Sequence, residues 1–187
     1  MASSLTLFDV TVPLFRKGMK TLKHILEKGE AYAKENGIST NDVVNWKLAE
    51  DMKPLTFQIQ TASNTAKNTC VRVAKLELAV LDDNEETLED LYKRIDTTLA
   101  LLDEVEEKNK VEFEGKEDSE VVLVTRGTER KFTGQSYVQT FAIPNFYFHV
   151  TTAYTQRNEI TEINIKEKKV VKRQNVYSIV VTIQIQE

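Results

Sequence analysis

The chain has few of the residues that most often carry chemistry. Its 187 residues include one cysteine and two histidines. Cys70 has no partner for an internal disulfide and lies among apolar helical neighbours, so we expect a buried structural thiol. His24 and His149 are too few for a metal site made of three imidazoles. No glycine-rich phosphate loop, nucleophile elbow, CxxC or HExxH motif occurs, so no strong motif identifies an enzyme class.

Charge and hydropathy exclude two classes of partner. The formal net charge of −4 disfavours binding to a nucleic-acid backbone. No apolar run approaches the roughly 20 residues that span a bilayer, which argues against a membrane partner. The first ten residues, MASSLTLFDV, lack the basic start and the apolar stretch of a secretory signal. We therefore expect a cytoplasmic protein.

Four long segments carry apolar residues at intervals of three and four, the spacing of one helix face. The first begins near Pro13 and ends at Gly37, and the second follows Pro54. The third follows the acidic run 82–87, and Thr133 caps the fourth. The expected inward residues are Val12, Phe15, Met19, Leu22, Leu26, Gly29 and Ala33; Leu55, Ile59, Ala62, Ala66 and Val73; Leu88, Leu91, Ile95, Leu102 and Val105; and Tyr137, Phe141, Asn145, Phe148 and Thr152.

These segments predict a mainly all-α fold, an antiparallel four-helix bundle over residues 1–158. Residues 108–132 contain the β-branched run VVLVT and the turn RGTE, which predict a small hairpin or an irregular excursion with Gly127 at its tip. We expect Pro144 to kink the fourth helix. From Glu159 the pattern alternates, so residues 159–187 form a second unit, a β-prone C-terminal tail.

Four blocks between Ser4 and Tyr154 carry a family resemblance. They are TLFDVTVPLFRKGMKTLKHILEKGEAYA, AEDMKPLTFQIQTASNTAK, ETLEDLYKRIDTTLALL and KFTGQSYVQTFAIPNFYFHVTTAY. In this order they resemble an uncharacterised helical family of fungi and bacteria. That family is similar in fold to the DinB/YfiT-like superfamily of four-helix proteins, some of which are metal-dependent thiol transferases or hydrolases. The resemblance implies the bundle and leaves the activity open.

The superfamily's metal site implies three histidines, one on the second long helix and two spaced HxxxH on the fourth. Here the second helix has no histidine, and the residues four positions from His149 are Asn145 and Ala153. His24 lies between lysines, away from the apolar stripe, so we expect it to be solvated. The sequence therefore predicts no metal and no other cofactor.

His149 is the best single candidate for a catalytic residue. It lies among aromatic residues in IPNFYFHVTTAY, where burial would keep the imidazole neutral and able to act as a general base. The alternative is a core histidine hydrogen-bonded to a carbonyl or to a facing glutamine. The candidate ligand-binding residues, which could converge between the helices, are Asn145, Thr152, Tyr154, Gln58, Asn64 and Trp46.

Two classes of function follow, and the sequence does not decide whether the protein is an enzyme. The first is a metal-free protein that binds or transforms a small apolar molecule around His149. The second is a non-enzymatic structural or interaction module that forms a homodimer through helix faces. A divergent metal-dependent transferase or hydrolase of the DinB type is a further alternative.

Overall fold

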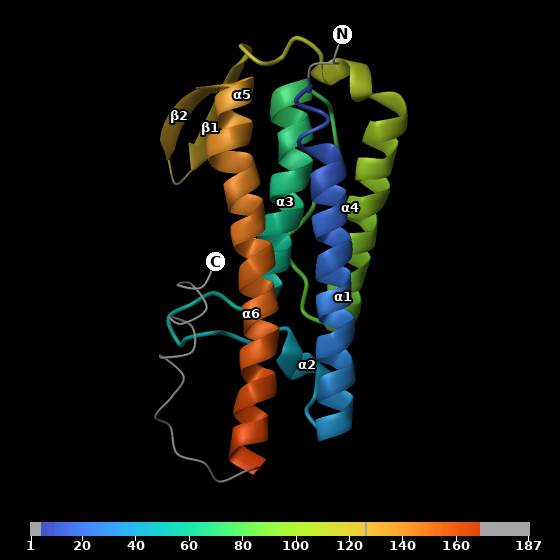
Figure 1. Ribbon diagram of the computed structural model, residues 1–187, viewed down its shortest axis with the longest axis vertical. Coiled ribbons are helices and arrows are strands. Elements are labelled where there is room, and N and C mark those ends of the chain that lie inside the picture. Colours follow the sequence, from blue (N-terminus) through green and yellow to red (C-terminus); the bar gives the residue numbers. More distant parts are fainter. Residues whose placement is uncertain (1–4, 126, 169–187) are drawn as a thin grey trace.

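The computed structural model describes residues 5–125 and 127–168. Within this part of the chain four long helices lie side by side along the longest axis (Figure 1): α1 (Val12–Asn36), α3 (Leu55–Ala74), α4 (Leu88–Lys108) and α6 (Ile143–Lys168). The shorter elements are α2 (Thr40–Val43), the 3-10 helix η1 (Lys110–Phe113), β1 (Glu120–Thr125), β2 (Thr128–Thr133), α5 (Gly134–Tyr137) and the π turn η2 (Val138–Ala142). The predicted helical bundle is confirmed.

Side-chain contacts show that α1 and α4 run in opposite directions. Arg16 of α1 pairs with Asp103 of α4 at 2.9 Å, and Lys23, further along α1, pairs with Asp96 at 2.6 Å. Residue numbers rise along one helix and fall along the other, as in an antiparallel pair. These ion pairs lie on the surface, so each contributes little to stability.

By the same test, α3 and α4 run in the same direction. Arg94 reaches the carbonyl of Gln60, and the hydroxyls of Ser63 and Thr98 lie 2.6 Å apart, so residue numbers rise together. The connection between two parallel helices must return along the bundle. Residues 75–87 make this crossover in an extended conformation (Figure 1).

The helix ends follow from local chemistry. Gly37 ends α1 in the left-handed conformation with φ 68°, which glycine adopts without steric cost. Thr87 begins α4 in a capping box with Asp90, and Thr133 begins α5 in a capping box with Ser136. All the residues predicted to face inward on α1, α3 and α4 are buried, as the helical spacing predicted.

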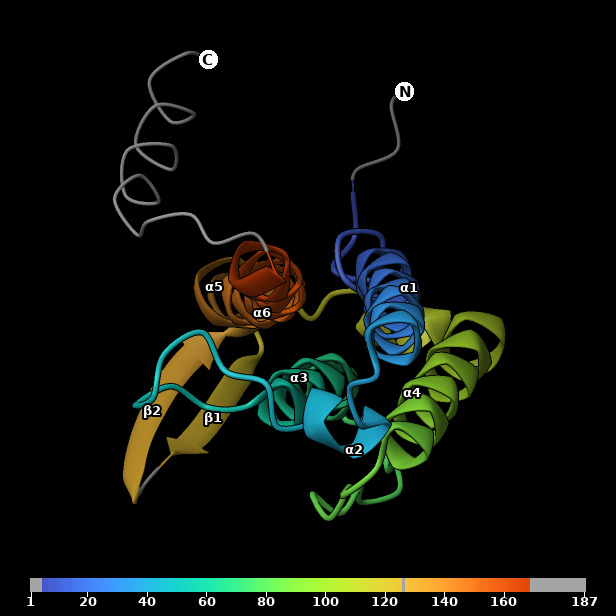
Figure 2. The ribbon, with the colours of Figure 1, turned by 90° about the horizontal axis from the view of Figure 1, so that it is seen from below.

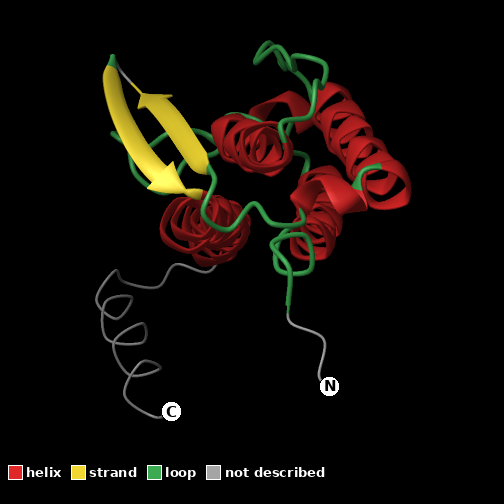
Figure 3. Ribbon diagram, turned by 90° about the horizontal axis from the view of Figure 1, so that it is seen from above, coloured by secondary structure: helices red, strands yellow, loops and turns green. Residues whose placement is uncertain are grey.

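The predicted hairpin insertion is confirmed. β1 and β2 pair antiparallel up to Thr125 opposite Thr128, and Gly127 lies in the turn with φ 76°. Val121 and Leu123 are buried, while the alternate residues of β1 face outward. Figures 2 and 3 look along the bundle and show the hairpin beside α3 and α5, on the side away from α4.

The fourth helix faces the core differently from the prediction. The π turn η2 precedes Pro144, and the N–H of Ile143 donates to the carbonyl of Val138, five residues earlier. Such a turn holds one residue more than an α-helical turn and rotates the following face by roughly 100°. Phe148 is consequently 60% exposed, so its predicted inward position is wrong, and Phe146 is fully buried in its place.

The strand prediction for the tail is wrong over residues 159–168, because α6 continues as a helix through Lys168. Extending an existing helix fixes one residue for each hydrogen bond gained, whereas a new hairpin must first be nucleated. The rest of the predicted tail, residues 169–187, lies outside the described residues. The boundary predicted after residue 158 falls within α6, and the division of the chain into two units stays a prediction.

α1 and α6 approach closely where Gly18 faces an aromatic ring. Phe146 packs over Gly18, and its ring centroid lies 4.7 Å from that of Phe15. A Cβ at Gly18 would lie 2.6 Å from Cζ of Phe146, closer than atoms of a packed core can approach. At Gly29, further along α1, a Cβ would make only ordinary contacts, the nearest at 3.5 Å. The packing around α1 therefore leaves room for a side chain at Gly29 but not at Gly18.

We predict that Gly18→Ala lowers the free energy of unfolding by about 1–3 kcal/mol, because overpacking outweighs the gain in helix propensity. Gly29→Ala is the matched control and is expected to be neutral or stabilising by up to about 1 kcal/mol. Urea unfolding of both variants measures the difference. Equal effects at the two positions would contradict the packing described here.

Candidate functional site

His149 lies in the seam between α6 and α3, which run antiparallel. Its Nδ1 atom is 2.7 Å from Oε1 of Gln58, and the side chain is only 7% exposed. Gln58 is itself buried and stands near the start of α3. The facing glutamine of the core-histidine alternative is therefore present, and the same contact defines how His149 can act chemically.

The proton on His149 is assigned by the surrounding hydrogen bonds. Nε2 of Gln58 donates to the carbonyls of Lys53 at 3.1 Å and Pro54 at 3.4 Å. Carbonyls only accept, so this orients the amide and leaves Oε1, also an acceptor, facing the imidazole. Nδ1 of His149 must then carry the proton and donate it. Nε2 of the neutral ring keeps its lone pair.

Burial lowers the pKa of His149 to about 4, because the charged imidazolium loses its hydration. Two aromatic rings lie in T-shaped contact with the imidazole: Phe57 at a centroid distance of 5.8 Å and Phe148 at 5.1 Å. Phe57 is 37% exposed, so both rings reach the surface. His149 is thus a buried neutral imidazole beside two partly exposed aromatic rings.

Gln156 extends the polar network and was missed in the sequence. Its Nε2 donates to the carbonyl of Lys53 at 2.8 Å, so this carbonyl accepts from both α3 and α6. Gln156 is fully buried, and no donor in the described part of the chain reaches its Oε1. The signal was available, since Gln156 follows His149 by seven residues and so lies two turns along the same helix face.

Two further predicted residues lie on the same stretch of α6. Asn145, one turn before His149, donates to the hydroxyl of Thr65 on α3 at 2.9 Å. The hydroxyl of Thr152 donates to the carbonyl of Phe148 in its own helix. The structure therefore brings Gln58, Asn145 and His149 to one seam, with Thr152 at its edge.

The other three predicted ligand-binding residues lie elsewhere. Tyr154 is 49% exposed, and the guanidinium of Arg157 lies over its ring at 5.3 Å. Asn64 points toward the crossover, where it donates to Asp83 at 2.9 Å. Trp46 is buried in the connector before α3. The spacing of these residues in the sequence could not show which way their side chains point, because packing sets the rotation of each helix.

A shallow, mostly apolar hollow of about 360 Å³ lies on the outer side of α6. It is lined by Leu48, Tyr147, Phe148, Thr151, Thr152 and Thr155. Phe148 is shared, since it borders the hollow and also contacts His149. The hollow is therefore next to the histidine, with the ring of Phe148 between them.

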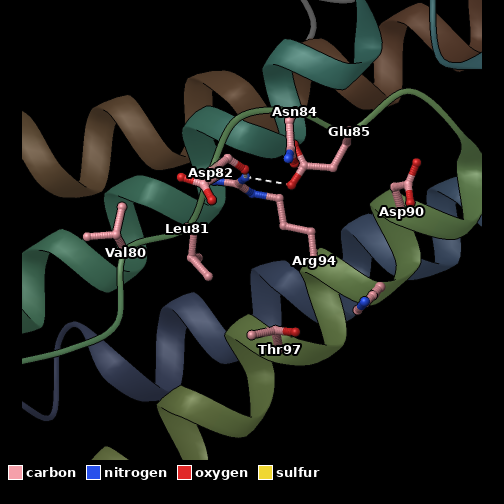
Figure 4. A pocket seen from close by; sticks show the side chains of 9 residues that line it. Val80, Leu81, Asp82, Asn84, Glu85, Asp90, Arg94 and Thr97 are labelled. Atoms are coloured by element: carbon pink, nitrogen blue, oxygen red, sulfur yellow. Dashed lines mark hydrogen bonds and ion pairs between the residues drawn. The ribbon is translucent and has the colours of Figure 1, made fainter.

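Arg94 is the second candidate site and was also missed. It is 4% exposed although it is charged, and it pairs with Asp83 at 2.8 Å and Glu85 at 2.7 Å. It also donates to the carbonyl of Asp82. Figure 4 shows Arg94 reaching from α4 to this crossover segment, at a hollow of about 390 Å³. The sequence pattern that could have indicated this site is a charged residue on the apolar stripe of α4, next to Ile95.

The groups around Arg94 serve to hold the crossover. Gln60 donates to Glu85 at 2.8 Å, and the ammonium of Lys67 donates to the carbonyl of Ala79 at 3.3 Å. Burial, more than the nearby charge of Arg94, lowers the pKa of Lys67. Because both terminal nitrogens of Arg94 are bonded to the crossover, the cluster acts as a structural clamp between α3, α4 and the crossover, although Nε of Arg94 has no hydrogen-bond partner in the described residues.

Other chemical candidates fall away in the described part of the chain. Burial raises the pKa of Cys70 to about 12, so the thiol is not nucleophilic at neutral pH, as the predicted structural role requires. Across residues 5–125 and 127–168, no group of three or more His, Cys, Asp or Glu side chains is placed to hold a metal ion. In the same residues no helix has the length and apolar character to cross a membrane.

Comparisons with known proteins place the chain among domains without an assigned function. A family model described as "Domain of unknown function (DUF1993)" matches residues 7–156. A crystal structure of a DinB family member protein from Shewanella denitrificans is similar, with 33% sequence identity and a TM-score of 0.74. The similarity covers 82% of this chain and 85% of that chain. No curated protein matches the sequence.

We predict that Arg94→Met lowers the free energy of unfolding by about 3–5 kcal/mol, because Glu85 would remain buried without its positively charged partner. Arg16→Met is the control, since Arg16 pairs with carboxylates at the surface and should cost about 1 kcal/mol or less. Urea unfolding measures both. Similar small losses would show that Arg94 does not clamp the crossover.

The pKa of His149 predicts a pH dependence of stability. Between the unperturbed pKa of 6.5 and the folded value of about 4, the unfolded chain binds a proton that the folded chain does not. The free energy of unfolding therefore has its full contribution from the neutral His149 above pH 6.5. This contribution is lost as the pH falls toward 4, and in total it amounts to about 3 kcal/mol.

His149→Gln should accordingly lose about 3 kcal/mol less stability than the wild type between about pH 7 and pH 4. His24→Gln, which changes the exposed histidine of α1, should keep the wild-type dependence. Urea unfolding at several pH values gives the comparison. Parallel curves for the wild type and His149→Gln would contradict the assigned neutral imidazole.

Proposed function

The chain belongs to the DUF1993 family, and from the geometry of the seam we propose that it binds a small, mostly apolar molecule beside His149 without a metal. The single observation that supports this proposal is the fixed tautomer of His149. Oε1 of Gln58 accepts a hydrogen bond from the N–H at Nδ1, so Nε2 is left as a hydrogen-bond acceptor on a ring that Phe57 and Phe148 contact. The family resemblance expected from the sequence blocks is confirmed, while the ligand itself is our proposal.

The chemistry of the site defines the kind of ligand. A neutral imidazole accepts from an O–H or N–H group, and the rings of Phe57 and Phe148 favour an apolar or aromatic body. A ligand with one such donor on a small ring satisfies both requirements. Because burial lowers the pKa of His149 to about 4, the imidazole accepts a hydrogen bond from the ligand and does not take its proton, and Gln58 holds the ring in place.

The metal-dependent alternative does not fit the residues of the seam. The superfamily's ligand set requires a histidine on the second long helix, and α3 instead presents the amide of Gln58, which already accepts from His149. On α6 the positions four residues away hold Asn145, which is bonded to Thr65, and Ala153. One imidazole with one amide does not make a site for a transition ion.

We predict that small aromatic alcohols and amides, with phenol, benzyl alcohol and benzamide as probes, raise the melting temperature of the wild type. A ligand at 100 times its dissociation constant stabilises the folded state by about 2.7 kcal/mol. His149→Ala should abolish the shift, because the acceptor is gone. Thermal melts at pH 7, followed by chemical-shift mapping of the probe that binds, make the measurement.

The control is His24→Ala, which removes the exposed histidine and should leave the response to the probes unchanged. If no probe shifts the melting temperature and His149→Ala only destabilises, His149 is a core residue and the binding proposal fails. An equal shift in the wild type and His149→Ala would place the probe elsewhere.

A further inference from the structure

Arg94 has one hydrogen-bond donor more than the clamp uses. Its terminal nitrogens donate to the carbonyls of Asp82 and Gln60. They also pair with the carboxylates of Glu85 and Asp83, so every N–H group of these two nitrogens is engaged. The remaining donor, at Nε, is buried and has no hydrogen-bond partner in the described residues. A buried donor without an acceptor is costly, so an acceptor brought to Nε would stabilise the cluster.

The clamp as a whole buries more positive than negative charge. The side chain of Arg94 is 2% exposed, and Lys67 is buried near it with one hydrogen bond to the described part of the chain, to the carbonyl of Ala79. The carboxylate of Glu85 is 9% exposed, whereas that of Asp83 is 52% exposed and faces water. Two buried cations therefore meet one buried carboxylate, which favours a further negative group at this place.

The hollow of about 390 Å³ beside the clamp presents further donors. The ammonium of Lys93 and the hydroxyl of Thr97 line it, and neither makes a hydrogen bond or an ion pair with another described residue. Thr97 follows Lys93 by four residues and Arg94 by three, so the three side chains are neighbours on the surface of α4. Together with Nε of Arg94 they form a set of donors suited to a carboxylate.

Two carboxylates line the same hollow. That of Asp82, in the crossover, is exposed and makes no contact with another described residue. Asp90 accepts with Oδ2 alone, from the N–H groups of Glu86 and Thr87 and from the hydroxyl of Thr87, and its Oδ1 stays available. Figure 4 shows Asp82 and Asp90 on opposite sides of Arg94. The hollow thus has acceptors for an ammonium group as well as donors for a carboxylate.

We propose that this hollow binds a free α-amino acid with an apolar side chain, its carboxylate at Arg94 and Lys93 and its ammonium at Asp82 and Asp90. A simple anion would meet the two carboxylates, and a simple cation would meet Lys93 and Arg94. A zwitterion satisfies both sets of charges, so the mixed lining selects it against either.

The size and the remaining lining agree with this class of ligand. Val80 and Leu81 also line the hollow and provide apolar contacts for a side chain. The volume of about 390 Å³ is near the lower end of the range for small-molecule sites, roughly 300–1,000 Å³. An amino acid is small enough to occupy it.

This inference does not rest on the ligand proposed beside His149. The hollow lies where α4 meets the crossover, whereas His149 lies between α3 and α6. The two sites share no residue, so each can be removed without the other.

The test is isothermal titration calorimetry of the full chain with three probes of one skeleton. L-leucine carries both charges, 4-methylpentanoate lacks the ammonium, and 3-methylbutylamine lacks the carboxylate. We expect L-leucine to bind with a dissociation constant below about 1 mM and at least about tenfold more tightly than either of the other two.

Two variants test the two ends of the ligand. Asp82→Asn removes an acceptor charge and Lys93→Gln a donor charge, and each should weaken the binding of L-leucine at least about tenfold. Asp118→Asn, in the loop before β1, and Lys20→Gln, on α1, make the same changes at exposed residues elsewhere and should bind as the wild type does. Melting temperatures measured in parallel show that all the variants are folded.

Three results would overturn the proposal. The first is no binding of L-leucine at concentrations up to about 10 mM. The second is binding of either single-charge probe as tight as that of L-leucine, because the hollow would then not select a zwitterion. The third is binding that Asp82→Asn and Lys93→Gln leave unchanged while His149→Ala abolishes it, which would place the amino acid in the seam.

Discussion

The rotation of α6 is the constraint on which the rest of the structure depends. Pro144 has no N–H to donate, and the π turn η2 before it lets the N–H of Ile143 reach back five residues. The extra residue turns the helix so that Phe146 meets Gly18 and His149 meets Gln58. A regular α-helical turn would present a different set of side chains to α1 and α3. The rotation of α6 thus determines at once which of its residues lie in the core, which lie in the seam with α3 and which lie on the outer face.

The seam and the Arg94 clamp use buried polar groups in different ways. Around Arg94, two carboxylates and a carbonyl compensate the charge, and the product is a fixed crossover between two parallel helices. In the seam, His149 stays neutral, and the carbonyl of Lys53 joins α3 to α6 through Gln58 and Gln156. Buried networks of this kind favour one arrangement, since any slip leaves a polar group without a partner. The protein thus has a DinB-like fold, and in its seam His149 is bonded to the side-chain amide of Gln58.

The helical spacing predicted α1, α3 and α4 and their buried faces, because residues three and four apart share a helix face whatever the helix packs against. It was wrong for Phe148, because nothing in the period shows an inserted residue in a turn. It also missed Arg94, whose burial depends on carboxylates of the crossover that lie 9 and 11 residues earlier in the chain. Alternation from Glu159 predicted strands, whereas over residues 159–168 the chain continues α6.

The sequence by itself determined the family, the helical bundle, the hairpin turn at Gly127 and the position of His149 among aromatic residues of the last long helix. These depend on local period, caps and glycine conformations, which a short stretch of chain specifies. Only the tertiary structure decided that Gln58 faces His149, that Tyr154 and Asn64 point elsewhere, and which atom of the imidazole carries the proton. Those outcomes depend on the rotation and direction of one helix against another, which contacts between distant residues fix.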